Sequence, residues 1–504
     1  MHQGALQGYF ALPAGLAGWT VGQQAKSNSV IMKVVFVYPG ISAIGFKSFG
    51  NPVLGYESSM IHHGLCSLSA SLKPEGFKVE LIDMRSLTGW EDFVLTLRKL
   101  EPDVVGITSL SVEYDIVRRA LALTKGVAPS IATLVGGVHP TVATDEVAAD
   151  PNVDHIITGE AEISVVGLLR ALAAGRACER VMVGERLPDL DELPFADREL
   201  FDYQAELSNP FLADVFGFEP PFVTILTSRG CMYNCSFCQP SERLMFGRKV
   251  RRRTVSNVMS ELEYLRDRYD FASLMIHDDS MTQEADWVEE FCDEYQGRGF
   301  HQPFWAQSRA DFVCEHPQIV GLMAQAGLAG LSIGFESGSD RILRMLRKGV
   351  TVRQNYDAAR ICRKYGIKIF ANYMFGVPTE SKDEVMDTVR MIREIRPDHH
   401  SCSFFTPLPG SDLAAYCAQN NLCLPHSHGE YNRGRLTAKI RGVDYGFLLR
   451  AVDEARGVGI LGRILRRFQR TRLGREAIRS LSLFHPCRVA LTALMRFMRR
   501  QAVR

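Results

Sequence analysis

Residues 222–238 read Phe-Val-Thr-Ile-Leu-Thr-Ser-Arg-Gly-Cys-Met-Tyr-Asn-Cys-Ser-Phe-Cys, an apolar strand that runs through a Ser-Arg-Gly turn into three closely spaced cysteines. On one loop, Cys231, Cys235 and Cys238 can bind three irons of a cubane cluster and leave the fourth iron open, whereas an electron-transfer cluster takes four cysteines. A structural zinc ion is the alternative, but it takes four ligands in paired spacings, and the chain has no Cys-x-x-Cys pair elsewhere. The nearest histidine, His277, lies on a different predicted strand. The loop therefore predicts a 4Fe–4S cluster on the three cysteines.

This loop opens a region, 222–412, in which short apolar strands alternate with helical segments. The predicted strands are Phe222–Thr227, Leu274–His277, Phe304–Ser308, Leu331–Phe335, Ile367–Phe375 and Cys402–Thr406. Two of the helices between them have clear start signals, because Thr351-Val-Arg-Gln354 and Ser381-Lys-Asp-Glu384 both fit a capping box. Six strand–helix units predict a partial (β/α)6 barrel, whose site forms at the C-terminal ends of the strands.

Residues 32–170 alternate in a similar way and predict a separate α/β domain. The predicted strands are Val34–Tyr38, Val79–Asp83, Val104–Thr108, Thr133–Gly136 and His155–Thr158. Continuous apolar runs between helices indicate a parallel, doubly wound, Rossmann-like sheet that binds its ligand outside the carboxyl ends of the strands. Glycines at these ends let a large planar ligand approach the backbone. The candidate ligand-binding residues at these ends are Ser109, Gly136, Gly137, His139, Thr141, Gly159 and Glu160.

The remaining segments flank and join these two regions. Residues 1–31 form an extension that we expect to be disordered, and Met32 directly before the first strand is an alternative start. Residues 171–221 contain proline-rich turns and are expected to be a linker, and residues 413–504 have no strand pattern and are expected to be helical.

The spacing Cys-x-x-x-Cys-x-x-Cys, with Phe237 before the last cysteine, resembles the radical S-adenosylmethionine (SAM) superfamily. The resemblance implies that the open iron chelates the amino and carboxylate groups of SAM, and that one electron then releases a 5′-deoxyadenosyl radical. The electron would come from a reductant protein such as flavodoxin or ferredoxin.

Later strand ends match the same family in order. The resemblance places Asp278, Asp279 and Ser280 near the methionine amino group, although Asp-Asp-Ser departs from the commoner Gly-Gly-Glu and looks like the acidic variant of corrinoid-dependent members. It also implies contacts of Arg309 and Glu336 with ribose and carboxylate, and of Gly376 and Glu380 with adenine. The structural alternatives are an Arg309–carboxylate pair and helix caps at the two glutamates.

The N-terminal region resembles the cobalamin-binding domain that precedes this class of barrel. The matching stretches are Pro102–Thr108, Gly136–Thr141, Gly159–Glu162 and the linker Leu190–Phe195. The chain departs from the pattern in having no Asp-x-His-x-x-Gly sequence, and His62-His63-Gly64 lacks that spacing. The resemblance therefore implies a cobalamin whose lower face has no histidine ligand; a domain that has lost its ligand is the alternative.

Charge is distributed unevenly along a chain whose formal net charge is only +1, so the whole molecule shows no bias toward nucleic acid. Residues 456–504 contain thirteen arginines, no lysine and one acid, Glu476. Apolar stripes at helical spacing beside these arginines predict peripheral contact with the inner face of the cell membrane, while a packed helical cap with a solvated arginine face is the alternative. Twelve cysteines without a signal peptide indicate a reducing cytoplasm.

These features favour a cobalamin-dependent radical SAM enzyme that methylates an unactivated carbon of a lipid-like or natural-product substrate. One alternative is a non-methylating enzyme of the same architecture that performs oxidative cyclisation, rearrangement or carbon–carbon coupling. Another, of a different class, is a corrinoid-binding or membrane-attached scaffold without turnover. A methylthiotransferase would need a second cysteine triad, which the sequence lacks.

Overall fold

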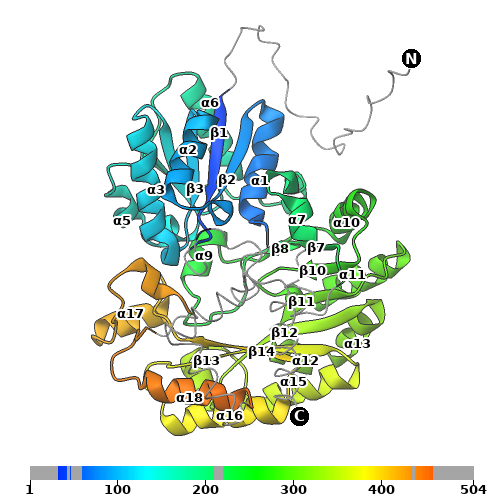
Figure 1. The fold of residues 1–504 in the computed structure, drawn as a ribbon. Helices are drawn as coiled ribbons and strands as arrows, with labels where there is room; N and C mark the ends of the chain where they lie inside the picture. The colour runs from blue at the N-terminus through cyan, green and yellow to red at the C-terminus, as the bar shows by residue number, and fades with distance from the viewer. Residues whose placement is uncertain (1–31, 42–45, 47–59, 209–218, 434–436, 458–504) are drawn as a thin grey trace, which may run out of the picture.

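Two parallel sheets, one above the other in Figure 1, form the framework of the protein. The structure, a computed structural model, describes residues 32–41, 46, 60–208, 219–433 and 437–457. Each sheet has six strands; helices pack on both faces of the first sheet and on one face of the second, so the predicted combination of a doubly wound domain and a partial barrel is confirmed.

The N-terminal sheet has the strand order β2-β1-β3-β4-β5-β6, all parallel. Its strands are β1 (Lys33–Tyr38), β2 (Lys78–Asp83), β3 (Val104–Thr108), β4 (Ala132–Gly136), β5 (His155–Thr158) and β6 (Val181–Val183). Its helices are α1 (His63–Leu72), α2 (Trp90–Leu100), α3 (Tyr114–Val127), α4 (Val138–Val142), α5 (Thr144–Ala148) and α6 (Glu162–Ala173). Val34 and Phe36 of β1 face α1 and α6, while Val35 and Val37 face α2 and α3, so both faces of the sheet are covered.

The C-terminal sheet runs in chain order from one edge to the other, with β7 and β14 as its edges. Its strands are β7 (Phe222–Ile225), β10 (Ser273–Ile276), β11 (Phe304–Ser308), β12 (Leu328–Glu336), β13 (Lys368–Phe375) and β14 (His399–Phe404). Its helices are α9 (Ser241–Phe246), α10 (Val255–Tyr269), α11 (Ala285–Gly297), α12 (Ala310–Glu315), α13 (Pro317–Ala326), α14 (Asp340–Met345), α15 (Val352–Lys364) and α16 (Lys382–Ile395). A short antiparallel pair, β8 (Ser228–Arg229) and β9 (Arg251–Arg252), lies beside the start of the barrel.

Local sequence signals account for the helix starts and for the buried faces. Both predicted capping boxes form: the Thr351 and Ser381 hydroxyls accept hydrogen bonds from the backbone N–H groups of Gln354 and Glu384. On α10, the apolar residues at helical spacing from Val255 to Leu265 are all buried against the barrel core.

One continuous hydrophobic core joins the two sheets. The domain built on the N-terminal sheet is called the upper domain. Its core on the side of α1 and α6 continues through Phe201 and Tyr203 into the barrel core around Leu262. Since burying a large apolar side chain contributes about 1.5–3 kcal/mol, this continuity fixes how the two domains sit against each other.

The chain differs from expectation in three places. The first sheet continues beyond residue 170, because β6, in the segment expected to be a linker, pairs with β5. The last barrel strand, expected at Cys402–Thr406, begins at His399 and ends at Phe404. Residues 413–457 are only partly helical: α17 (Asp412–Gln419) and α18 (Tyr445–Ala455) are separated by irregular chain that includes the turn η8 (His428–Tyr431). The extension 1–31 and most of the arginine-rich segment lie outside the described residues.

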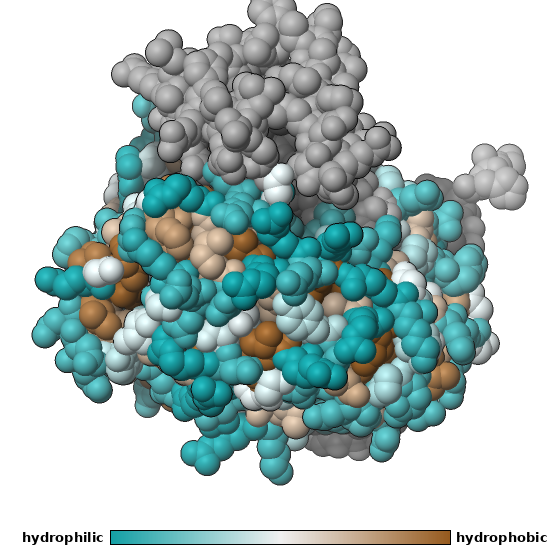
Figure 2. Space-filling view, turned by 90° about the horizontal axis from the view of Figure 1, so that it is seen from below, coloured by the Kyte–Doolittle hydropathy of each residue, from teal (hydrophilic) through white to brown (hydrophobic). Residues whose placement is uncertain are grey.

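The underside of the barrel is mostly hydrophilic, with small separate groups of hydrophobic residues on the part made by described residues (Figure 2). In the described part of the chain, no helix combines the length and the apolar character needed to cross a bilayer.

The capping box at α15 generates a stability test. Replacing Thr351 with Ala removes the acceptor for the Gln354 N–H and should lower the free energy of unfolding by about 1 kcal/mol in a urea titration. Thr351→Ser keeps the acceptor and is the matched control. Equal stability of the two variants would contradict the assigned cap.

Candidate functional site

The cysteine loop follows β7 and β8 and is held in place by the C-terminal end of α14, the first helix after β12. Gly230 has φ +94°, a left-handed backbone that favours glycine and turns the chain into the loop. The Ser236 N–H donates to the Leu346 carbonyl over 2.9 Å, and its hydroxyl donates to the Met345 carbonyl over 2.8 Å. The Met232 N–H donates to Gln283 over 2.9 Å. The loop is thus anchored between the predicted cysteine positions rather than at its ends alone.

The three thiols differ in their surroundings. Cys235 is buried, Cys231 is half-buried and Cys238 is exposed. Burial raises the pKa of the Cys231 thiol to about 11, and the charges of Asp279 and Glu242 act in the same direction. Since thiolates bind iron, cluster assembly must expel this proton. A single metal ion would require the three sulfur atoms to lie within about 4.8 Å of one another. In the described part of the chain, the three cysteines do not meet this condition.

Arg309, at the end of β11, reaches the cysteine loop. Its guanidinium lies 3.5 Å from the centre of the Tyr233 ring and 3.8 Å from the Cys235 sulfur. It also forms a forked contact with Asp311, at 2.7 and 3.0 Å. The structural alternative, a carboxylate pair, is therefore present, and that pair aims the guanidinium at the loop.

The acidic segment after β10 divides into two roles. Asp278 is fully buried and accepts hydrogen bonds from the Thr227 N–H at 2.6 Å and the Ser228 hydroxyl at 2.7 Å, so it braces the strand end before the cysteines. Asp279 faces Glu242, and burial together with the facing carboxyl raises the pKa of Glu242 above its usual range.

The remaining predicted barrel residues lie at the ends of β12 and β13. Glu336, with φ +61°, is buried and paired with Lys348 at 2.9 Å. Glu380 accepts hydrogen bonds from the Gly376 N–H at 2.6 Å and the Val377 N–H at 3.3 Å, and burial raises its pKa to about 8. Both glutamates have structural partners, and their assignment to the SAM site stays a prediction.

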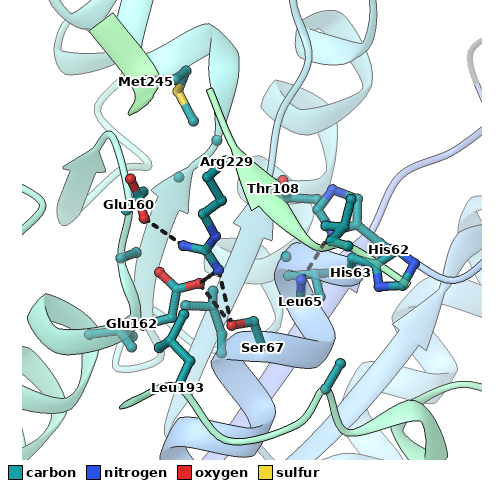
Figure 3. Close-up of a pocket in the computed structure, with 18 of the residues that line it drawn as sticks. His62, His63, Leu65, Ser67, Thr108, Glu160, Glu162, Leu193, Arg229 and Met245 are labelled. Carbon is teal, nitrogen blue, oxygen red and sulfur yellow. Dashed lines mark hydrogen bonds and ion pairs between the residues drawn. The ribbon is translucent and has the colours of Figure 1, made fainter. Parts of the chain in front are cut away.

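A cavity of about 400 Å³ lies between the upper domain and the start of the barrel (Figure 3). From the upper domain it is lined by the carboxyl ends of β3, β4 and β5 and by the start of α1. From the barrel it is lined by Arg229, Met245 and Asp279, among others. Its floor needs glycine: a Cβ on Gly137, where φ is +99°, would lie 2.9 Å from the Thr108 hydroxyl.

The predicted residues of the upper domain separate into two groups. Gly136, Gly137, Gly159 and Glu160 line the cavity. Ser109, His139 and Thr141 are not among the lining residues: Ser109 and His139 are fully buried, and the Thr141 hydroxyl accepts a hydrogen bond from the Gly159 N–H at 2.8 Å. In the structure, Ser109 and His139 pack in the interior, and Thr141 supports the loop after β5.

A buried ion network crosses from the upper domain to the cysteine loop (Figure 3). Arg229, two residues before the first cysteine, contacts Glu160 at 2.6 Å and Glu162 at 2.5 Å. Arg251 of β9 also pairs with Glu160, and the Ser67 hydroxyl donates to Glu162 over 2.8 Å. Arg229 and Ser67 lower the pKa of Glu162 against the opposing effect of burial, so the carboxylate stays charged.

Sequence reasoning missed several of these residues. Arg229 comes just before the cysteine motif, and Glu242 and Met245 come just after it. His62 and His63 lack the spacing of a cobalt-ligating histidine motif, yet both line the cavity. His62 Nδ1 accepts a hydrogen bond from the Leu65 N–H at 3.0 Å, and burial lowers its pKa to about 4, so the ring is neutral at the cavity wall. The available signal was Arg229, the single charged residue between the strand and the first cysteine.

The residues present fit the cofactors that the motifs imply. Among the described residues, the Ser280 hydroxyl and one oxygen each of Gln239 and Glu242 are buried near the cysteine loop without a hydrogen-bond partner. Orphaned polar atoms beside three thiols suit a polar ligand of an open iron. The glycine floor of the cavity suits a flat macrocycle.

Comparisons with known proteins bear on both halves of this site. Residues 225–392 match the family model of the Radical SAM superfamily, and residues 53–169 match that of the B12 binding domain. An uncharacterized methyltransferase of Pyrococcus horikoshii is 28% identical over 423 residues, which cover 80% of this chain and 86% of that protein. An anaerobic magnesium-protoporphyrin IX monomethyl ester cyclase of Rubrivivax gelatinosus is 26% identical over 402 residues, which cover 76% of this chain and 69% of that protein.

The fold also has solved counterparts. The structure of the cobalamin-dependent SAM radical enzyme OxsB, with aqua-cobalamin and SAM bound, is similar with a TM-score of 0.66 at 18% identity. The match covers 94% of this chain and 72% of that chain. At this identity the likeness concerns the fold.

The ion network generates a second prediction. Arg229→Met leaves Glu160 with Arg251 alone and Glu162 without an arginine, which should lower the free energy of unfolding by about 3–5 kcal/mol. Arg229→Lys keeps the charge but cannot bridge both carboxylates and should fall between. Urea unfolding and the cobalamin retained after gel filtration are the measurements. Wild-type retention and stability in Arg229→Met would refute the bracing role.

Proposed function

The chain belongs to the cobalamin-dependent radical SAM enzymes, and from this premise we propose that it is a C-methyltransferase acting on an unactivated carbon of a lipid-like or natural-product substrate. Its cofactors are a 4Fe–4S cluster, SAM and cobalamin. The matched methyltransferase of Pyrococcus horikoshii supports the transfer of a methyl group.

The observation that carries the proposal is the position of the cavity. Strand ends of the B12-binding domain form one wall, while Arg229 and Asp279, from the two strand ends that flank the cysteine loop, form part of the other. A corrinoid in this space and a sulfonium ligand at the open iron would therefore face one volume. With these groups bound, the cofactors supply a methyl donor and a hydrogen-abstracting radical.

The residues of the chain have positioning and protective roles in this proposal. Cys231, Cys235 and Cys238 hold the cluster, and Arg309 steadies the loop through Tyr233 and its contact with the Cys235 sulfur. Asp279, Ser280 and Glu242 offer polar atoms to the methionine end of SAM. The apolar cavity wall, which includes Leu65 and Phe246, excludes water that would quench a radical.

Loss of one cluster ligand tests the enzyme against a corrinoid-binding scaffold. Cys235→Ala should lose the cubane signal in paramagnetic resonance of the anaerobically reconstituted, reduced protein, and should form no 5′-deoxyadenosine from SAM. Cys178→Ala, a cysteine outside the motif in the segment just before β6, is the control and should retain both. A cubane signal unchanged in Cys235→Ala would overturn the site.

The nature of the product tests methyl transfer. The reconstituted enzyme is incubated with SAM carrying a deuterated methyl group and with lipid and metabolite extracts of a strain that lacks the protein. Mass spectrometry should find a product that gains a labelled methyl group in the presence of cobalamin.

A non-methylating reaction is the second candidate, because the chain also matches an anaerobic cyclase. If 5′-deoxyadenosine forms while the product gains no label, oxidative cyclisation, rearrangement or carbon–carbon coupling replaces methyl transfer.

The arginine-rich segment 456–504 supports a lipid-like substrate through its expected membrane contact. The electron donor is expected to be a small reductant protein.

A further inference from the structure

Two histidines and a glutamate from distant parts of the chain meet where the segment after the barrel contacts the upper domain. His139 comes from α4, Glu146 from α5 and His428 from η8, which follows the barrel. One ligand atom from each lies within 4.8 Å of the others. None of the three residues lines the cavity.

The most deeply buried residue of the group, His139, has a ring nitrogen without a hydrogen-bond partner among the described residues. The His139 side chain is fully buried, and within the described residues its Nε2 has no hydrogen-bond partner. This nitrogen points at Glu146 Oε2, 3.6 Å away, which is too long for a hydrogen bond. A buried polar atom without a partner costs about 1–3 kcal/mol, so an unseen ligand is the economical explanation.

The second histidine has its donor nitrogen fixed by the backbone. His428 Nδ1 lies 3.0 Å from the Ser111 carbonyl, which can only accept, so Nδ1 carries the proton. In the neutral ring, Nε2 then carries a lone pair instead of a proton, and this nitrogen lies 2.9 Å from Glu146 Oε1. Two acceptors at this distance repel each other unless a cation or a second proton lies between them.

The same backbone segment orients both rings. The Ser111 hydroxyl lies 3.2 Å from His139 Nδ1 and is able to accept its proton; in that tautomer Nε2 of His139 carries a lone pair as well. Hydrogen bonds from the remote ring nitrogen are how proteins usually orient histidines toward a metal. Tyr114 packs on the His139 ring with centroids 4.3 Å apart, and the two histidine rings lie 5.0 Å apart, edge to face.

The distances suit one tetrahedral ion. Zinc bonds of about 2.0–2.2 Å at tetrahedral angles place two ligand atoms about 3.4 Å apart. His428 Nε2 lies 2.9 Å from Oε1 of Glu146, and His139 Nε2 lies 3.6 Å from Oε2, so the two imidazoles approach the two oxygens of one carboxylate at distances close to this value. Glu146 is half-exposed, so a water molecule can complete the coordination.

We propose that His139, Glu146 and His428 bind a divalent transition-metal ion of the zinc type. The ion joins α4 and α5 of the B12-binding domain to the segment that follows the barrel. Two imidazoles and one carboxylate are ligands that Zn²⁺ accepts readily. Because α4 begins directly after Gly137 in the cavity floor, the ion also braces that floor from behind.

Metal content and metal ligation test the proposal in the full-length protein with its cluster reconstituted. The protein is equilibrated with ZnCl₂, passed through gel filtration and analysed for zinc and iron by mass spectrometry, and its zinc K-edge absorption is recorded. We expect one zinc per chain beyond the iron, with a first shell of nitrogen and oxygen at about 2.0–2.1 Å. A sulfur shell would place the zinc on cysteines and overturn the proposal, as would failure to retain zinc.

Paired variants assign the ligands. Glu146→Gln and His428→Gln should each lose the retained zinc while keeping iron and helix content. Asp145→Asn, the neighbouring acid on α5, and His426→Gln, the neighbouring exposed histidine, should retain it. Zinc retained equally in all four variants contradicts the site. The absorption spectrum of the unaltered protein decides the matter even if a variant does not fold.

Discussion

The buried contacts of Arg229 with Glu160 and Glu162 are the interaction on which the rest of the site depends. A charge removed from water is tolerated only when it is paired, so Glu162 depends on Arg229, and Glu160 depends on Arg229 together with Arg251. Arg229 comes two residues before the first cysteine, and the glutamates come directly after β5 of the B12-binding domain. The same interaction that satisfies these charges therefore sets the position of the cysteine loop relative to the cavity.

Around this network, most polar groups at the strand ends act on the loop or on each other before they can act on a ligand. Asp278 braces β7, Arg309 is aimed by Asp311, and Glu380 caps its own turn. The groups with spare hydrogen-bonding capacity are fewer: among the described residues they include Ser280, Gln239 and Glu242. Strand-end residues in such a barrel thus form a rigid support, and a smaller set is left to contact the cofactors.

The strands could be predicted because their signals are local, and the motif of three cysteines is local in the same way. A run such as Val104–Thr108 matches its strand residue for residue, and the capping boxes at Thr351 and Ser381 form as their spacing indicates. The expected linker was a less accurate interpretation, since β6 is short and mostly exposed and therefore has a weak apolar pattern. It is a strand because β5 provides hydrogen-bond partners for its backbone.

The sequence by itself determined the type of cofactor chemistry, the two α/β regions and the family that the chain resembles. Each of these depends on residues that lie close together in the chain. Tertiary structure alone decided which side chains share a space. Arg229 reaches Glu160, and His139 meets His428, across long stretches of sequence. Such meetings depend on how two domains pack, and packing is a sum of many weak apolar contacts that no short motif encodes.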